Sequence, residues 1–189
     1  MEGAVTQEHA RSSVADRSRV VAAAGLVVGA LLGIAGAFAP TAAPRGLAWG
    51  IDGTAIVVGS ALLVVHHVRA GSDVVAAGFL VFLAGETLIV SGSAMELAAS
   101  APTFAAGAAL WSAGLALVSV PAVMPIALRV TGGIASVLLA ITALRIFGGG
   151  RLSPLSEPLP FFAYPFLAIT LVGWAWAHVR GRGTTEGRR

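Results

Sequence analysis

The stretch from Asp73 to Ser100 limits the folds open to this chain more than any other feature. It reads DVVAAGFLVFLAGETLIVSGSAMELAAS, and Glu86 stands near its middle among apolar and small residues. A helix needs about 20 mostly apolar residues to span a bilayer, so this run is long enough to cross one. A carboxylate at the centre of a membrane helix is costly, and it therefore requires a structural or functional reason.

Similar apolar runs recur along the chain, which is 57% hydrophobic and only 11% charged. The runs are continuous rather than alternating, which argues against a membrane β-barrel and leaves helices to satisfy the backbone in lipid. We therefore predict an all-α integral membrane protein, a bundle of six transmembrane helices with short loops. The predicted helices cover about 20–39, 49–68, 73–99, 103–124, 126–147 and 161–179 within a membrane domain 19–180, between a polar cytoplasmic tail 1–18 and a disordered basic tail 181–189.

The arginines are distributed unequally between the two ends of this predicted bundle. One end would hold Arg11, Arg17, Arg19, Arg69, Arg129, Arg180, Arg182, Arg188 and Arg189, and the other Arg45, Arg145 and Arg151. Basic residues concentrate on the cytoplasmic side of membrane proteins, so both termini are predicted to be cytoplasmic. We expect a multi-pass protein of a bacterial inner (cell) membrane. The first apolar run is longer than the apolar part of a usual signal peptide, so we interpret it as a helix that is retained.

Small residues recur at helical spacing in two of the predicted helices. Gly25, Gly29 and Gly33 lie four residues apart, and Gly78, Gly85 and Gly92 lie seven apart. Such series place small residues on one helix face and let a neighbouring backbone approach closely. These two glycine series should lead the packing of the bundle.

The glycine series also orients Glu86, because Glu86 and Ser93 repeat by seven on a face beside it. Glu86 should therefore point into the bundle, where no arginine is predicted at its depth and desolvation favours the neutral acid. Its nearest polar candidates are Thr87, Ser91 and Ser93. Two interpretations stay open: a proton- or cation-binding carboxylate in a transport path, or a protonated clamp between helices.

A second polar group is predicted near the outer ends of the helices. Asp52, Glu96 and Arg145, with Arg45, Arg151 and Glu157, could line an outer vestibule. Ordinary interfacial charge explains the same residues and is the preferred interpretation, since exposed ion pairs are common and contribute little stability.

Metal binding and catalysis find little support in the sequence. The chain has no Cys, and His66, His67 and His178 are interpreted as anchors at the cytoplasmic interface. Adjacent histidines diverge by about 100° on a helix, which suits a shared ion poorly. No cofactor, metal site or catalytic motif is predicted. An intramembrane enzyme acting on lipid would need a second catalytic group at the depth of Glu86, and none is predicted there.

The preferred function is a small proton- or cation-linked transport or channel-like protein that uses Glu86. The alternative is a non-catalytic scaffold, sensor or accessory subunit in which Glu86 is a structural clamp. The expected partners are the lipid bilayer and either further copies of the chain or another membrane protein. The high pI of about 11.0 reflects arginines at helix ends rather than a surface for nucleic acid.

Overall fold

The computed structural model describes residues 2–180 and their side chains from residue 15 onward. Its regular structure consists of six α-helices, in agreement with the predicted all-α class. The predicted C-terminal tail 181–189 lies outside the described residues. The helices are α1 (Glu2–Ala37), α2 (Ala42–Arg69), α3 (Asp73–Gly92), α4 (Ala101–Ser119), α5 (Ile126–Phe147) and α6 (Ala163–Arg180).

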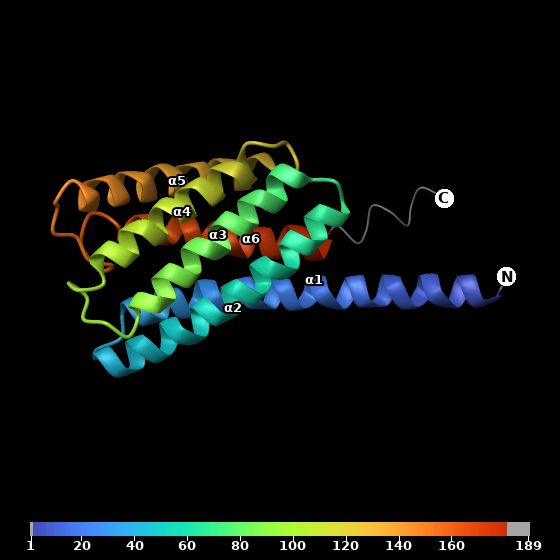
Figure 1. Cartoon of the computed structure of the whole chain (residues 1–189), viewed down its shortest axis with the longest axis horizontal. Helices are drawn as coiled ribbons and strands as arrows, with labels where there is room; N and C mark the ends of the chain where they lie inside the picture. Colours follow the sequence, from blue (N-terminus) through green and yellow to red (C-terminus); the bar gives the residue numbers. More distant parts are fainter. Residues whose placement is uncertain (1, 181–189) are drawn as a thin grey trace.

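Two helices begin earlier than the sequence suggested. The polar segment predicted as a tail belongs to α1, which extends well beyond the other helices at its N-terminal end (Figure 1). Helix α2 begins at Ala42 rather than near residue 49, although Pro44 lies in its first turn. The first backbone N–H groups of a helix have no partner within the helix, so a proline is tolerated there.

Helix α3, in contrast, ends earlier than predicted, at Gly92 rather than near residue 99. The hydroxyls of Ser91 and Ser93 donate to the carbonyls of Leu88 and Val90, at 2.6 and 2.7 Å. Serine hydroxyls that bond backward in this way compete with the helix and favour its end. As a result Glu96 lies in the turn segment after α3 rather than on the helix.

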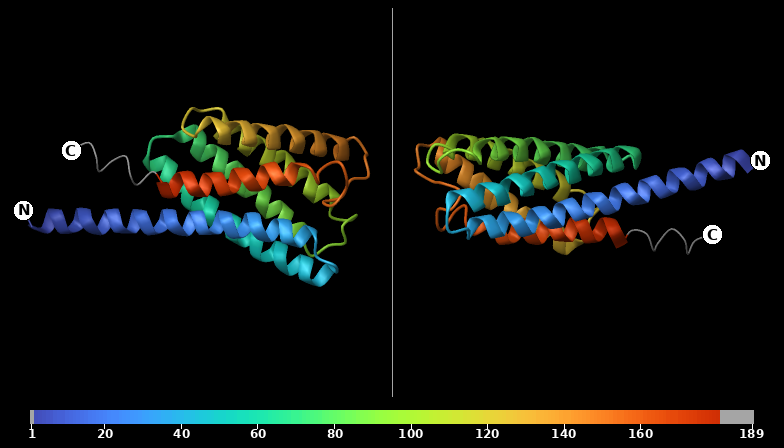
Figure 2. Two further views of the ribbon diagram at one scale, coloured as in Figure 1. Left: turned by 180° about the vertical axis from the view of Figure 1, so that it is seen from behind. Right: turned by 90° about the horizontal axis from the view of Figure 1, so that it is seen from below.

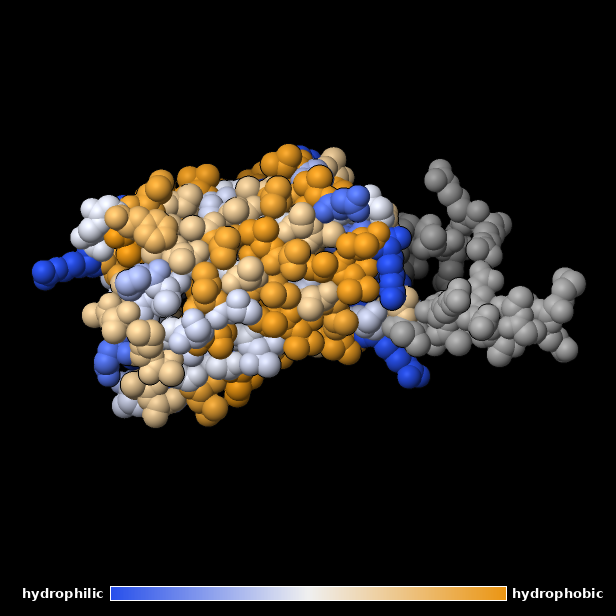
Figure 3. Space-filling view, in the orientation of Figure 1, coloured by the Kyte–Doolittle hydropathy of each residue, from blue (hydrophilic) through white to orange (hydrophobic). Residues whose placement is uncertain are grey.

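Five of these helices, α1 to α5, are long and apolar enough to cross a membrane. Large apolar side chains on their outer faces are exposed, among them Leu31, Leu80 and Leu144. On the face drawn in Figure 3 apolar side chains dominate the middle of the molecule, and hydrophilic ones gather toward its ends. The protein is therefore an apolar helical bundle of the kind that lies in a membrane.

The helices form a closed ring. Each helix packs against the next one in the chain, and α6 packs against α1 (Figure 2). The start of α1 and the end of α6 lie at the same end of the bundle (Figure 1). We call this the terminal end and the other the loop end.

Both glycine series lie in helix contacts of this ring. A Cβ atom added to Gly25 would lie 2.6 Å from the carbonyl oxygen of Ala55 on α2. Between α3 and α4, a Cβ on Gly85 would lie 2.8 Å from the carbonyl oxygen of Gly107, and the reverse distance is also 2.8 Å. Side chains at these positions would push the backbones apart, so the small residues permit the close approach.

Aromatic side chains fill the middle of the ring. Phe79 of α3 and Trp174 of α6 meet with ring centroids 4.9 Å apart, although α3 and α6 are not neighbours in the ring. Phe82 lies 5.8 Å from Trp174 and stacks on Trp111 at 5.7 Å. We call Phe79, Phe82 and Trp174 the aromatic barrier, because all three rings are buried and Trp174 contacts both phenylalanines across the middle of the ring.

Candidate functional site

The half of the interior toward the loop end contains a cavity of about 80 Å³. Helices α1, α2, α3, α4 and α6 and the loop before α6 contribute to its wall. Most of the wall is apolar, including Ile56, Phe104 and Leu167. Its polar side chains are Trp49, Asp52, Glu86, Ser93, Ser100, Thr103, Trp111 and Tyr164.

Glu86 is almost fully enclosed at this cavity, with 2% of its surface exposed. Its Oε1 lies against α2, 2.8 Å from the point where a Cβ on Gly53 would stand. Its Oε2 is buried and has no hydrogen-bond partner. The prediction that Glu86 points into the bundle agrees with this position.

Asp52 lines the same cavity from α2 and lies against α1. Its Oδ1 and Oδ2 are 3.1 and 2.9 Å from the points where Cβ atoms on Gly29 and Gly33 would stand. Oδ1 is buried and has no hydrogen-bond partner. Two glycines of the α1 series therefore make room for a carboxylate, in addition to bringing helices together.

The expectation that Glu86 is the only acid at its depth is wrong. Asp52 and Glu86 line one cavity and interact electrostatically. The error came from the predicted start of α2: because this helix begins at Ala42, Asp52 lies roughly 15 Å along it rather than at its end. We call Asp52 and Glu86 the acid pair. The described residues contain one ion pair, between Arg19 and Asp16, and it does not involve either acid.

Three aromatic residues with an N–H or O–H donor line the cavity beside the acid pair, and sequence reasoning missed their role. Tyr164 donates its hydroxyl to the carbonyl of Pro154 at 2.6 Å, and Trp49 donates its indole N–H to Gly33 at 3.2 Å. The Trp111 indole interacts with the Glu86 carboxyl, but its N–H does not reach ordinary hydrogen-bond geometry with any acceptor. The cavity thus combines unpaired acceptor oxygens with an unpaired donor.

The candidate partners of Glu86 divide into two sets. Thr87 and Ser91 are exposed and donate to carbonyls of their own helix, so they face away from the acid pair. Ser93 lines the cavity and also donates to Val90. Only Ser93 is therefore placed to share a ligand with Glu86.

The predicted outer vestibule does not form one site. Asp52 belongs to the acid pair, whereas Glu96 lines a separate groove with Arg45 between the start of α2 and the segment after α3. Arg145 is exposed and lines neither space. The sequence placed all of these groups near one membrane surface, but it contained no signal for how far each extends inward.

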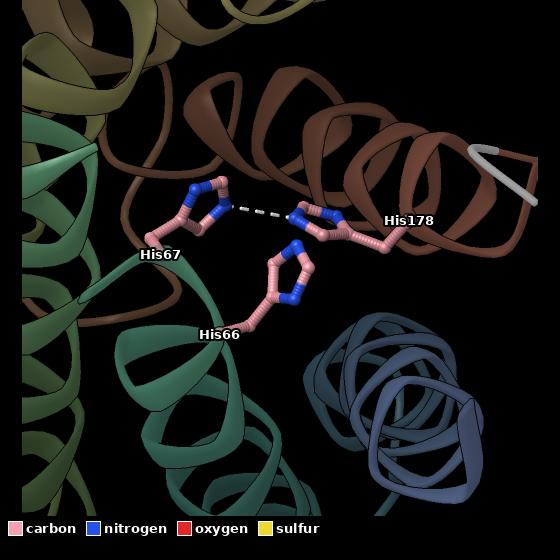
Figure 4. A group of neighbouring side chains, drawn as sticks. All are labelled: His66, His67 and His178. Atoms are coloured by element: carbon pink, nitrogen blue, oxygen red, sulfur yellow. Dashed lines mark hydrogen bonds between the residues drawn. The ribbon is translucent and has the colours of Figure 1, made fainter. Parts of the chain in front are cut away.

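The half of the interior toward the terminal end holds three histidines (Figure 4). His67 of α2 and His178 of α6 are joined by a hydrogen bond of 2.9 Å between their Nε2 atoms, and His66 lies against both rings. The divergence of His66 and His67 on one helix held no information about His178, which approaches from another helix. We call the three residues the histidine cluster.

No protein-family model, no curated protein and no solved structure matches the chain.

Proposed function

We propose that the protein is a small membrane transport protein that binds a proton or a small cation at the acid pair. One observation carries this proposal. Two carboxyl groups line a common cavity, each has a buried oxygen without a hydrogen-bond partner, and no basic side chain among the described residues pairs with them. Nearby carboxyl groups without a counter-ion favour taking up a proton or another cation.

The dimensions of the cavity support an ion rather than a large substrate. A buried water needs about 10–15 Å³ of such volume, so the cavity of about 80 Å³ holds on the order of five waters. A proton on the acid pair, or a small cation with part of its hydration shell, fits this space. A buried polar atom left unpaired costs about 1–3 kcal/mol, so a bound cation would also offset a standing penalty.

The clamp hypothesis receives weaker support. A carboxyl that joins helices should have both oxygens in hydrogen bonds, and Oε2 of Glu86 has no partner. Among the residues that the structure describes, Trp111 on α4 is the donor that interacts with the Glu86 carboxyl, and it does so outside ordinary hydrogen-bond geometry.

The acid pair also raises a second candidate, an intramembrane hydrolase. Asp52 is the second acidic group that such an enzyme would require beside Glu86, and paired carboxyls can activate water. The small cavity favours ion binding over hydrolysis of a lipid. Hydrolysis of lipid by the wild-type chain in vesicles, lost in Glu86→Gln and Asp52→Asn, would favour the enzyme instead.

For the membrane arrangement we propose six spans, with α6 included and both termini cytoplasmic. The support is that α6 closes the ring between α5 and α1 and ends at the end of the bundle at which α1 begins. The chain has no native Cys, so single cysteines can be labelled without background. A cysteine at Ser156 should react from outside the cell and one at Ser72 only after the membrane is opened. Equal reaction of both from outside would exclude this arrangement.

The transport proposal is tested in liposomes under an imposed proton or sodium gradient. We expect Glu86→Gln and Asp52→Asn to reduce flux by at least about tenfold, because each replaces an ionisable carboxyl group by a neutral amide. Glu96→Gln is the matched control. Glu96 lies in the separate groove beside Arg45 and not at the cavity of the acid pair, so its substitution should leave flux unchanged. Full flux in both acid-pair variants would rule out the proposal.

A further inference from the structure

The histidine cluster lies outside the acid pair, on the other side of the aromatic barrier. His67 and His178 are buried, with 4% and 7% of their surfaces exposed, whereas His66 is half-buried. One nitrogen from each ring lies within 4.8 Å of one nitrogen from each of the others. Three imidazoles from two helices thus converge on one point (Figure 4).

The hydrogen bonds define which nitrogens are free. Nδ1 of His178 lies 2.6 Å from the carbonyl oxygen of Trp174, and only a protonated Nδ1 can donate to a carbonyl. A neutral His178 therefore directs the lone pair of Nε2 at His67, which donates its own Nε2–H across 2.9 Å. Histidines that bind metals typically hold their second nitrogen in this way, with the N–H on a backbone carbonyl.

His67 is the residue that would change when an ion arrives. Its Nδ1 is buried and has no hydrogen-bond partner. If the proton of His67 moves from Nε2 to Nδ1, the lone pairs of both Nε2 atoms face the same point. Nδ1 of His67 is the unpaired atom before and after this shift. Binding the ion therefore leaves no additional buried polar atom without a partner.

We propose that His66, His67 and His178 bind one divalent transition-metal ion of the zinc class. Imidazole nitrogen suits Zn²⁺, Cu²⁺ and Ni²⁺, and three nitrogens leave a fourth position for water or another group. Ligand nitrogens on tetrahedral zinc stand about 3.3 Å apart, given metal–nitrogen distances near 2.0 Å. The pair at 2.9 Å has to open slightly, and the half-buried ring of His66 has to rotate inward.

The surroundings hold the rings in place but carry little charge. His67 stacks on Phe79 with ring centroids 5.5 Å apart, which fixes its plane. Arg19 acts electrostatically on His66 and His178, and its charge is opposed by its ion pair with Asp16. Three neutral imidazoles do not neutralise the charge of a divalent ion. A bound ion would therefore be more stable if the site were open to water on the side of His66.

The test uses the full chain in detergent, purified with a tag that contains no histidine and stripped of metal with EDTA. Co²⁺ is the probe, because its visible absorption reports both binding and tetrahedral geometry. We expect saturation at one Co²⁺ per chain, with displacement by Zn²⁺. His67→Ala and His178→Ala should each weaken Co²⁺ binding by at least about 100-fold, since losing a ligand exceeds the loss of an outer-shell partner.

His9→Ala is the matched control, because His9 is the one histidine outside the cluster, and it should bind Co²⁺ within about twofold of the wild type. His67→Gln and His178→Gln retain hydrogen-bonding side chains and replace the alanine variants if these do not fold. A Zn²⁺-dependent rise in melting temperature should occur in the wild type and be absent from the glutamine variants. Absence of a saturable spectrum, or a spectrum that persists in the double glutamine variant, would overturn the proposal.

Discussion

The two halves of the ring interior both bury titratable side chains, but they differ in how these side chains are packed and hydrogen-bonded. Toward the loop end, Asp52 and Glu86 face a hollow space and keep buried oxygens without partners. Toward the terminal end, His67 and His178 fill their space and bond to each other and to the Trp174 carbonyl. The acid pair thus borders a cavity and has unpaired buried oxygens, whereas the histidine cluster is packed and most of its buried nitrogens are hydrogen-bonded.

This difference predicts opposite effects on stability. Unpaired buried acids cost free energy, and natural proteins keep such groups where function requires them. A packed and hydrogen-bonded cluster contributes stability even when no ion is bound. The comparison therefore separates residues retained for an activity from residues that also hold the bundle together.

The largest effect is expected from removing part of the aromatic barrier. Trp174 is 1% exposed and contacts both Phe79 and Phe82. Trp174→Ala should lower the free energy of unfolding by about 3–5 kcal/mol, because it leaves a large cavity. Thermal unfolding in detergent measures the change. Trp176→Ala, on the same helix but 50% exposed, is the control and should cost less than about 1 kcal/mol. Similar melting temperatures for the two variants would contradict the packing of Trp174 against Phe79 and Phe82 in the middle of the ring.

Next in size is the loss of the hydrogen bonds that satisfy the histidine cluster. His178→Ala removes the bonds to the Trp174 carbonyl and to His67, and should lower the free energy of unfolding by about 2–3 kcal/mol. His66→Ala, which removes a half-buried ring, should cost less than about 1 kcal/mol. Both are measured by thermal unfolding in EDTA, so that no metal contributes. Equal melting temperatures for the two variants would contradict the view that hydrogen bonds stabilise this half.

The sequence predicts a feature of this fold well when the residues that cause the feature lie close together in the chain. The bounds of α5 match the prediction at both ends, because Pro125 and the glycines from 148 onward stop a helix locally. The early start of α2 also had a local signal, Thr41 at the N-cap position with Pro44 in the first turn. The prediction started this helix at about residue 49 instead, and that choice moved Asp52 to a helix end.

The two polar groups depend on contacts that no local pattern contains. His67 and His178 meet from α2 and α6, which are not neighbours in the ring. Trp111 of α4 and Tyr164 of α6 both line the cavity of the acid pair, and no sequence pattern around either residue indicates that position. Apolar runs determine that helices form, but they do not determine the rotation and depth of each helix, and these place every side chain of both sites.

A change of opposite sign is expected at the acid pair. Glu86→Met replaces an acid that has an unpaired buried oxygen by an apolar chain of similar length, and should raise the free energy of unfolding by about 1 kcal/mol. The same variant should lose ion flux in liposomes. Glu86→Ala leaves a larger hollow and should stabilise less. A melting temperature for Glu86→Met as low as that of His178→Ala would mean that Glu86 is a structural clamp, and would remove the contrast between the halves.

The smallest effect is expected one residue away from Glu86. Thr87 is exposed on the outer side of α3 and donates its hydroxyl to the Ala84 carbonyl. Thr87→Val keeps the shape of the side chain and presents an extra methyl group to lipid. The free energy of unfolding, measured by thermal unfolding, should therefore change by less than about 0.5 kcal/mol. Flux in liposomes should equal that of the wild type, whereas Glu86→Gln on the same helix should reduce it by at least about tenfold. Because adjacent positions differ by about 100° around a helix, this pair tests which face of α3 meets the cavity. Loss of flux in Thr87→Val would place the transport path on the outside of the ring and would contradict the interior site.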